Sequence, residues 1–303
     1  MANDFGKVAV LMGGWSAERA VSLNSGQAVL AALRNQGVNA HGIDVDRNIV
    51  KKLTDDNFDC VFNILHGRGG EDGVIQGLLD IVQIPYTGSD VLGSALAMDK
   101  LRTKQLWKGV GLPTPDYQIL NSEDDCKIAV QRLGLPLMIK PVLEGSSIGM
   151  SKVNSVDDIN AAWQVAKQCE GIVIAEKFIQ GREYTAAILG EKVLPMIRLE
   201  TPRDFYDYKA KYDDEGTRYH CPCGLSDEHE EKLSALMFSA FESVGATGWG
   251  RVDFMLDYDD QPWLIEVNTV PGMTDHSLVP MAAKQAGMSF DELVIEILKG
   301  AMI

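Results

Sequence analysis

Two short runs near the C-terminal end of the chain, residues 251–256 and 263–268, alternate apolar and polar side chains. This period of two is typical of half-buried strands, whereas a helix would repeat every three to four residues. The segment between the runs, 257–262, is acidic and contains proline, and such residues favour a turn. We therefore expect an antiparallel hairpin whose polar side chains share one face.

The expected register of this hairpin brings polar side chains together. With residues 258–261 as the loop, Asp253 lies opposite Glu266, and Arg251 lies opposite Asn268. Opposed side chains are roughly 5 Å apart at Cβ, so two carboxylates there repel each other unless one is protonated or a cation intervenes. Two carboxylates and an amide oxygen form an all-oxygen donor set that suits Mg²⁺ or Mn²⁺. An ordinary hairpin with a solvated acidic face explains the same spacing.

The N-terminal part of the chain repeats a strand and helix pattern. Strands are expected at 8–12, 40–45 and 60–65, with helical stretches between them. This rhythm predicts a parallel sheet, which binds ligands at the carboxyl ends of its strands. Glu18 and His66 each follow such an end, so both are candidates for substrate contact.

A lysine at the end of a predicted strand is a candidate for phosphate binding. Neither a dinucleotide-binding glycine motif nor a Walker A motif occurs, so a nucleotide would need another device. Lys140 ends an apolar strand, and the glycine- and serine-rich loop 144–149 follows before the chain returns as a strand at 150–153. A lysine and free backbone amides together can cradle phosphate. A surface hairpin with a lysine at its base is the alternative.

Two later segments suggest nucleotide contact and a lid. Residues 171–179 form a predicted strand, and if it lies at a sheet edge its backbone at 176–179 can pair with adenine while Glu183 accepts from ribose. Residues 203–224 are polar, aromatic and irregular, so we expect a long loop of the kind that serves as a lid. Helices are expected at 228–244 and 290–299.

Composition limits the classes of partner. Twenty-eight basic and 43 acidic residues give a formal net charge of −15. Such a surface repels nucleic acid and anionic membrane, so we expect neither as a partner. The N-terminus has no signal pattern, and no apolar run approaches the ~20 residues that span a bilayer. We expect a soluble, cytoplasmic protein of two or three domains, without a disulfide framework despite five cysteines.

Seven motifs, in order along the chain, resemble segments of the D-alanine–D-alanine ligases, a family of the ATP-grasp superfamily. They are GGWSAER at 13–19, HGRGGEDG at 66–73, PYTG at 85–88, MDK at 98–100, KP at 140–141 with EGSSIGM at 144–150, FYDYKAKY at 205–212, and EVNTVPGMTDHS at 266–277. The resemblance implies an α/β fold, in which an N-terminal parallel-sheet α/β domain precedes the two α+β domains of an ATP-grasp fold. The implied bounds are 1–99 for the N-terminal substrate-binding domain, 100–180 for the central domain, and 181–303 for the C-terminal domain with the metal site and a lid at 203–224.

The implied activity is the ATP-dependent ligation of two D-alanine molecules to D-alanyl-D-alanine through a D-alanyl phosphate. ADP and phosphate are released, and the product serves peptidoglycan precursor synthesis. The resemblance also implies ATP as co-substrate, two Mg²⁺ (or Mn²⁺) ions and a homodimer.

Three alternatives remain. One is another ATP-grasp carboxylate–amine ligase, and a closer one is a depsipeptide-forming relative, which carries histidine where Tyr212 stands. The third is a nucleotide-binding regulatory protein without turnover, against which the presence of Lys211 and Arg251 argues.

The family's pattern assigns a role to each matching residue. The residues expected to bind ATP are Lys100, Lys140, Glu176, Lys177, Ile179 and Glu183, and those expected to bind metal are Asp253, Glu266 and Asn268. Lys211 would touch the γ-phosphate. Glu18, linked to Ser146 and Tyr212, would orient the ammonium of the first D-alanine, with His66 nearby. Arg251 and the amide of Gly272 would stabilise oxyanion charge, and Ser277 and Leu278 would bind the carboxylate of the second D-alanine.

Overall fold

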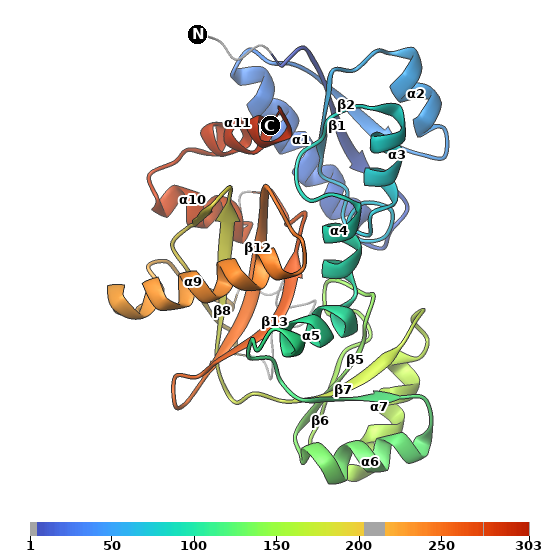
Figure 1. The fold of residues 1–303 in the computed structure, drawn as a ribbon, viewed down its shortest axis with the longest axis vertical. Coiled ribbons are helices and arrows are strands. Elements are labelled where there is room, and N and C mark those ends of the chain that lie inside the picture. The colour runs from blue at the N-terminus through green and yellow to red at the C-terminus, as the bar shows by residue number, and fades with distance from the viewer. Residues whose placement is uncertain (1–4, 203–215, 275, 303) are drawn as a thin grey trace.

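The computed structural model describes residues 5–202, 216–274 and 276–302, and within them three sheets are stacked along the long axis of the molecule (Figure 1). The first sheet is parallel, with strand order β2-β1-β3, as the strand and helix pattern predicts. Its elements are β1 (Lys7–Gly13), α1 (Arg19–Asn35), β2 (Asn39–Val45), α2 (Ile49–Asp55) and β3 (Cys60–Asn63).

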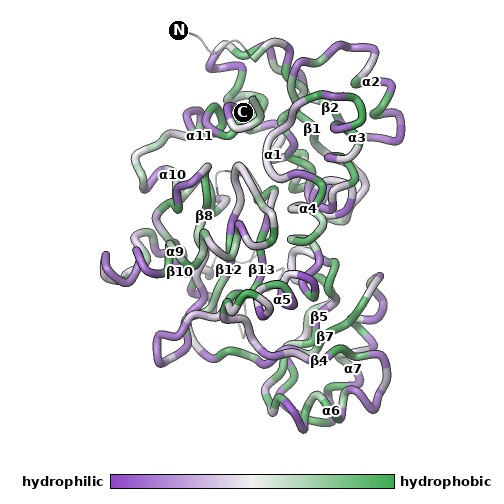
Figure 2. The backbone as a smooth tube through the Cα atoms, in the orientation of Figure 1, coloured by the Kyte–Doolittle hydropathy of each residue, from purple (hydrophilic) through white to green (hydrophobic). Residues whose placement is uncertain are grey.

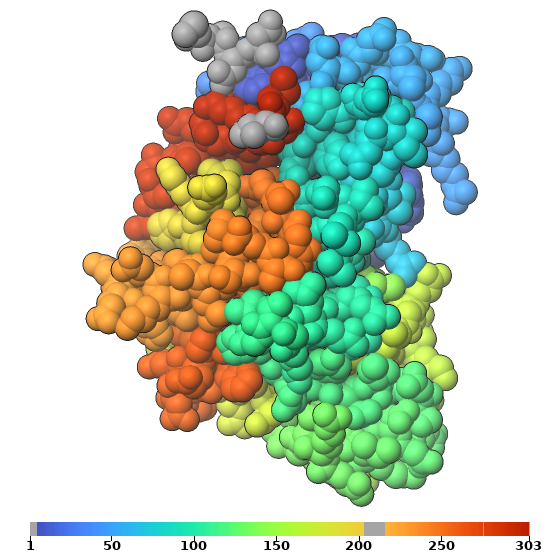
Figure 3. Space-filling model, viewed as in Figure 1, coloured from blue at the N-terminus to red at the C-terminus, as the bar shows by residue number. Residues whose placement is uncertain are grey.

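The C-terminal end of the chain returns to this first sheet. Helices α10 (Leu278–Gln285) and α11 (Phe290–Lys299) precede a final turn, η2 (Gly300–Met302). Side chains of α11, including Leu293 and Ile297, are buried in the same cluster as Val8 and Val10 of β1. Figure 3 shows the red C-terminal segment packed against the blue N-terminal one. The N-terminal layer therefore takes part of its core from the far end of the sequence, and the domain bounds remain a proposal.

Three helices lead from the first layer to the second. They are α3 (Val74–Val82), α4 (Val91–Met98) and α5 (Lys100–Gly109). Asp90 caps α4, and Asp99 caps α5 by accepting hydrogen bonds from the amides of Leu101 and Arg102, both at 3.0 Å. Because Asp99 caps the first turn of α5, it fixes the position of Lys100, the first residue of this helix. None of the described helices is long and apolar enough to cross a membrane.

The second sheet is antiparallel, with strand order β4-β7-β5-β6. Its elements are β4 (Tyr117–Leu120), α6 (Glu123–Leu133), β5 (Leu137–Pro141), β6 (Ser151–Val153), η1 (Val156–Asp158), α7 (Ile159–Ala166) and β7 (Val173–Lys177). The expectation that 176–179 lies at a sheet edge is wrong for this strand. Glu176 is paired with Tyr117 on one side and Met138 on the other, because β4, which the sequence pattern did not reveal, covers the flank of β7.

The third sheet has the order β11-β10-β8-β12-β13, with β9 paired to β8. Its elements are β8 (Gly181–Leu189), β9 (Lys192–Val193), β10 (Ile197–Glu200), β11 (Arg218–His220), α9 (Asp227–Ser243), β12 (Trp249–Asp257) and β13 (Pro262–Asn268). The expected long loop at 203–224 is wrong at 218–220, which form β11 against β10. Residues 203–215 lie outside the described residues.

The predicted hairpin is β12 and β13, and its decisive register is confirmed. Asp253 pairs with Glu266, and Arg251 pairs with Asn268. Nearer the turn the pairing shifts by one residue, since Phe254 opposes Leu264 and the extra residue, Ile265, makes a bulge. A bulge rotates successive side chains towards one side of a strand. Figure 2 shows the turn of this hairpin as a hydrophilic segment that projects from the molecule.

Candidate active site

A cavity of about 710 Å³ lies between the second and third sheets. Every residue expected to bind ATP contributes to its wall, and so do two of the expected metal ligands: Lys100, Lys140, Glu176, Lys177, Ile179, Glu183, Asp253 and Glu266. Ile265 also lines the cavity beside Glu266, so the β13 bulge turns both side chains towards it. Lys152, which no sequence motif indicated, places its ammonium 4.3 Å from the ring centroid of Phe178 on the same wall.

A buried charge cluster forms the floor of this cavity. Lys140 Nζ lies 2.7 Å from Glu176 Oε1, and Lys104 forms a second ion pair with the same carboxylate. Lys104 Nζ also donates to Thr114 Oγ1 at 2.7 Å. Burial lowers the pKa of Lys104 to about 8. Burial acts to raise the pKa of Glu176, but the two lysines outweigh it and hold that pKa below its ordinary value.

Asp253 is held by an arginine on its own strand. Arg251 donates from Nε to Oδ1 and from Nη2 to Oδ2, both at 2.7 Å. Thr185 Oγ1 donates to Oδ1 at 2.6 Å, and Asn268 Nδ2 donates to Oδ2 at 3.1 Å. Three expected site residues, from two strands, therefore meet at one carboxylate.

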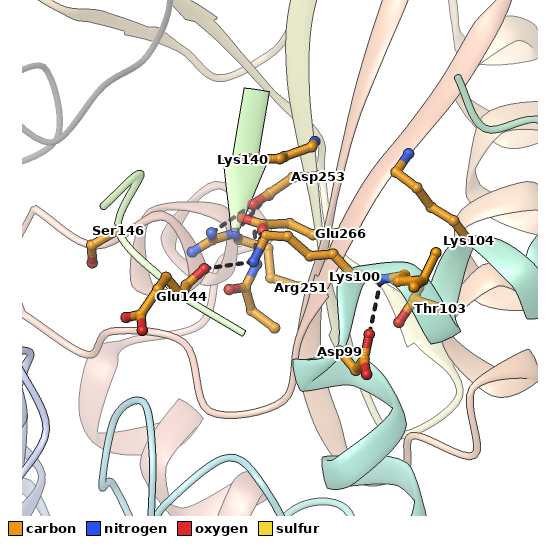
Figure 4. A network of polar contacts seen from close by, with 12 residues as sticks. Asp99, Lys100, Thr103, Lys104, Lys140, Glu144, Ser146, Arg251, Asp253 and Glu266 are labelled. Atoms are coloured by element: carbon orange, nitrogen blue, oxygen red, sulfur yellow. Dashed lines mark hydrogen bonds and ion pairs between the residues drawn. The ribbon is translucent and has the colours of Figure 1, made fainter. Parts of the chain in front are cut away.

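Glu266, opposite Asp253, has a cation of its own. Lys100 Nζ lies 3.0 Å from Glu266 Oε2 and donates to the Glu144 carbonyl at 2.7 Å (Figure 4). Burial acts to lower the pKa of Lys100, but the surrounding carboxylates, Glu266 first and then Glu18 and Glu71, together outweigh it and raise that pKa. The repulsion expected between the two carboxylates is therefore offset within the protein, by Arg251 on one side and Lys100 on the other.

The donor set of this hairpin fits a divalent cation that a phosphate also binds. Among the described residues, no three His, Cys, Asp or Glu side chains gather as a complete metal site. Two carboxylates and the Asn268 amide are the kind of partial set that Mg²⁺ uses when phosphates and waters complete its shell. The fit therefore depends on a nucleotide in the adjoining cavity.

Glu18 meets Ser146 where the first layer approaches the second sheet. Ser146 Oγ donates to Glu18 Oε1 at 2.5 Å. Glu18 precedes α1 but does not cap it with its side chain, so its carboxylate is directed to Ser146 instead. Gly67 and Gly145 leave room for it, since a Cβ on either would lie 2.7 Å or 2.9 Å from Glu18 Oε2.

A second carboxyl group near Glu18 escaped the sequence analysis. Glu71 accepts a hydrogen bond from the Gly67 amide at 2.6 Å. Burial, reinforced by the charge of Glu18, raises the pKa of Glu71 to about 8. Glu71 lies in the HGRGGEDG motif, directly after Gly69 and Gly70, so its place in the motif was the available signal, but its burial could not be read from the sequence.

His66 is buried, with both ring nitrogens bonded to protein. Nδ1 lies 2.8 Å from the Val270 carbonyl, and Nε2 lies 3.4 Å from Ser25 Oγ. Burial lowers the pKa of His66, so the ring is neutral at pH 7. The structure brings His66 close to the turn that carries Gly272, but it leaves no ring nitrogen free for a substrate.

Ser277, Leu278 and Gly272 lie together at the start of α10. Leu278 is the first residue of this helix and Ser277 its N-cap, although the serine side chain caps no amide of α10. Ser277 Oγ instead accepts from the Thr274 amide at 2.8 Å, and a Cβ on Gly272 would lie 3.0 Å from this oxygen. Lys211 and Tyr212 lie outside the described residues.

Comparison with known proteins points in one direction. A family model described as "D-ala D-ala ligase C-terminus" matches residues 106–299, and one described as "D-ala D-ala ligase N-terminus" matches 49–89. A D-alanine–D-alanine ligase of Nitrosococcus oceani is 56% identical over 98% of this chain and 94% of its own length. One of Methylococcus capsulatus is 57% identical over 98% and 96%.

Solved structures agree with the sequence relatives. The D-alanine–D-alanine ligase from Bacillus anthracis complexed with ATP has a TM-score of 0.85 at 30% identity, covering 98% of this chain and 97% of that one. The VanG D-Ala:D-Ser ligase from Enterococcus faecalis has a TM-score of 0.85 at 29% identity, covering 98% and 99%.

Proposed function

This chain belongs to the D-alanine–D-alanine ligase family, and we infer that the cavity and the β12–β13 hairpin form its active site. It is an ATP-dependent ligase that joins two D-alanine molecules for cell wall synthesis. ATP and D-alanine are its substrates. The observation that carries the assignment of the site is the register that places Asp253 opposite Glu266 on the wall of the 710 Å³ cavity.

ATP occupies the cavity between the sheets. Lys100 and Lys140 bind phosphate oxygens, since both ammonium groups are on its wall and each can exchange a carboxylate partner for a phosphate. Adenine contacts the segment that leaves β7, from Lys177 to Ile179, and Glu183 accepts from ribose. Because β7 is paired on both sides, the adenine contact comes from the residues after the strand rather than from its edge.

Asp253, Glu266 and Asn268 would hold two Mg²⁺ (or Mn²⁺) ions together with the phosphates of ATP. When bound, such ions neutralise charge on a transferring phosphoryl group. Arg251 and Lys100 hold the two carboxylates in this structure, so both cations already lie beside the groups that would bind the ions.

The first D-alanine is activated at its carboxylate. Glu18, fixed by Ser146, binds the ammonium of this substrate, so that a carboxylate oxygen faces the γ-phosphate. That oxygen attacks the phosphorus, ADP leaves, and D-alanyl phosphate results. Lys211 contacts the γ-phosphate, and Tyr212 joins the pair of Glu18 and Ser146, as the family's pattern implies.

The second D-alanine supplies the amine that attacks. Its carboxylate binds Ser277 and the Leu278 amide, where the positive end of the α10 dipole favours an anion. The attacking amine loses a proton and forms the amide bond, and phosphate leaves with its bridging oxygen. Arg251 and the Gly272 amide stabilise the oxyanion of the tetrahedral intermediate. Because an acyl phosphate hydrolyses readily, the segment 203–224, apart from the strand at 218–220, serves as a lid that excludes water.

Incubation of the purified protein with ATP and Mg²⁺ tests the function. ADP should form only with D-alanine, and mass spectrometry should identify D-alanyl-D-alanine as the product. D-serine and D-lactate belong in the same assay as competing acceptors, because a depsipeptide or D-alanyl-D-serine product would assign the chain to a different branch of its family. An equal rate of ADP formation with and without D-alanine would refute the ligase activity.

We also propose that the enzyme works in the cytoplasm, where ATP is abundant, and as a homodimer. Large apolar side chains are exposed on α3 and α4, including Val74, Ile81 and Leu92. A second copy would remove this surface from water. Sedimentation measurements test the dimer, and substitution of Ile81 by Lys should shift it towards monomer.

A further inference from the structure

A buried serine on α1, Ser25, contacts the turn that follows β13, although almost the whole chain separates them. Ser25 Oγ accepts a hydrogen bond from the Met273 amide at 3.1 Å and lies 3.4 Å from His66 Nε2. The serine side chain is fully buried. Nothing in the reaction scheme uses Ser25 directly, so its polar contacts require another explanation.

The proton positions in this cluster follow from its acceptors. The Val270 carbonyl can only accept, so His66 Nδ1, 2.8 Å away, must carry the proton. In a neutral imidazole Nε2 is then an acceptor, and the Ser25 hydroxyl donates to it. The serine oxygen in turn accepts from Met273 N–H. Ser25 thus makes both its contacts without conflict and fixes one tautomer of His66.

The two anchored backbone groups lie on either side of Gly272. Val270 is two residues before it and Met273 is the next residue, so the short turn between them is held at both ends. Loss of either hydrogen bond would free that turn to rotate and would change the direction of the Gly272 amide.

His66 also connects this turn with the first subsite. Its backbone carbonyl accepts from Ser16 Oγ at 2.7 Å, and Ser16 Oγ accepts from the Glu18 amide at 3.1 Å. The segment that holds Glu18 and the turn that holds Gly272 are therefore joined through one residue.

We propose that Ser25 is a positioning residue of this ligase, which acts through His66 and the Met273 amide to aim the Gly272 amide at the reacting carbonyl. His66 is then part of the support for this turn rather than a direct ligand of D-alanine. The inference rests on the proposed function, because it takes the Gly272 amide as an oxyanion donor.

Ser22 provides a matched control one turn earlier on α1. It is equally buried, accepts from the Gly13 amide at 2.9 Å and donates to the Ile64 carbonyl at 2.7 Å. Both of its partners belong to the N-terminal layer, so Ser22→Ala removes the same number of hydrogen bonds without touching the 270–273 turn.

Ser25→Ala and Ser22→Ala should be compared for dipeptide formation, ADP formation and thermal unfolding. Loss of a complete oxyanion donor costs about 10²–10³ in rate. A displaced donor in Ser25→Ala should lower kcat roughly tenfold, with little change in the KM for ATP. Because the acyl phosphate then waits longer for the amine, more of it meets water, and ADP released per dipeptide should rise above one. Ser22→Ala should melt at a lower temperature but keep this ratio at one.

Nitrogen-15 NMR of the histidines adds a readout that does not depend on activity. The wild-type His66 ring should carry its proton on Nδ1, and the Nε2 resonance should move in Ser25→Ala because its donor is lost. The proposal would be overturned if the Nε2 resonance did not move, or if Ser25→Ala kept a normal kcat. It would also be overturned if Ser22→Ala lost as much kcat as Ser25→Ala and released as much excess ADP per dipeptide. If Ser25→Ala fails to fold, Ser25→Cys replaces it, since the thiol keeps the volume and donates weakly. A wild-type protein that forms no dipeptide would refute the proposed function itself.

Discussion

Asp253 faces Glu266 across neighbouring strands, and each carboxylate is held by a different cation, Arg251 for the first and Lys100 for the second. Close carboxylates alone would destabilise the metal-free protein. The two ion pairs offset the repulsion between the carboxylates, and they hold both cations beside the reacting groups.

Asp253→Asn should abolish ligation, because a neutral amide is a weak ligand for Mg²⁺. The charge pattern also predicts a loss of stability rather than a gain. Arg251 would remain half-buried without its bidentate partner, at a cost of about 1–2 kcal/mol in the free energy of unfolding. Asp257→Asn on the same strand is the control, since Asp257 bonds the turn and Trp263. Near-normal turnover of Asp253→Asn at millimolar Mg²⁺ would exclude the hairpin as the metal site.

Gly145→Ala should impair the first D-alanine subsite and spare the fold. The new Cβ would lie 2.9 Å from Glu18 Oε2, and the flexible carboxylate can move away at little cost in stability. We expect the KM for D-alanine to rise roughly tenfold, the equivalent of about 1.4 kcal/mol, while the KM for ATP changes little. Gly109→Ala, where a Cβ meets nothing within 4 Å, is the control. A selective rise in the KM for ATP would contradict this placement of Glu18.

Lys104→Met should weaken ATP binding from a position that does not line the cavity. Glu176 would keep only Lys140, and that lysine could no longer leave it for a phosphate without stranding a buried carboxylate. We expect a higher KM for ATP, an unchanged KM for D-alanine, and a loss of about 3 kcal/mol in the free energy of unfolding. Lys108→Met, one turn along α5 in an exposed ion pair with Asp116, should change neither constant. Equal effects of both variants on the KM for ATP would show that the buried ion pair of Lys104 with Glu176 does not support ATP binding.

The pH dependence of stability should carry a contribution from Glu71. Its pKa is about 8 in the folded protein, against 4.5 as its ordinary value. Between these values the folded state binds more protons than the unfolded state, so this contribution to stability is present at low pH and is lost as pH rises through 8. Glu71→Gln mimics the protonated form. The melting temperature of this variant relative to that of the wild type should therefore rise from pH 5 to pH 8.

Glu292→Gln supplies a control of opposite sign for the titration. Hydrogen bonds from Ser289 lower the pKa of Glu292, so its contribution is present at neutral pH and is lost only as pH falls below about 4.5. The melting temperature of Glu292→Gln should lie below that of the wild type at pH 7 and approach it in acid. A constant offset for Glu71→Gln across pH 5 to 8 would show that Glu71 is ionised in the native state.

Local periodicity was enough to predict much of the fold. Alternation and turn residues predicted the β12–β13 hairpin and the pair Asp253–Glu266, and the strand and helix rhythm predicted the parallel order of the first sheet. The bulge at Ile265 was not predictable, because a local pattern does not show that a strand has one residue more than its partner. The simplest register nevertheless gave the correct pair, since the extra residue in β13 compensates for a turn one residue shorter than expected.

Contacts between distant segments could not be predicted in this way. The error over β7 arose because β4 pairs with it from more than fifty residues away. Lys104, Glu71 and Ser25 also escaped, because each gains its meaning from burial or from a partner brought close only by the fold. The motifs identified the residues expected to face ligands, whereas the residues that hold them in place could be recognised only from the structure.

Isotope transfer from substrate to phosphate tests the central claim most directly. D-alanine labelled with ¹⁸O in its carboxylate should be incubated with the enzyme, ATP and Mg²⁺, and the released phosphate analysed by mass spectrometry. If the carboxylate attacks the γ-phosphorus and phosphate later leaves with the bridging oxygen, each dipeptide formed should deliver one ¹⁸O atom to phosphate. Dipeptide formation with unlabelled phosphate would contradict the acyl phosphate route, and with it the roles inferred for Glu18, Arg251 and the hairpin.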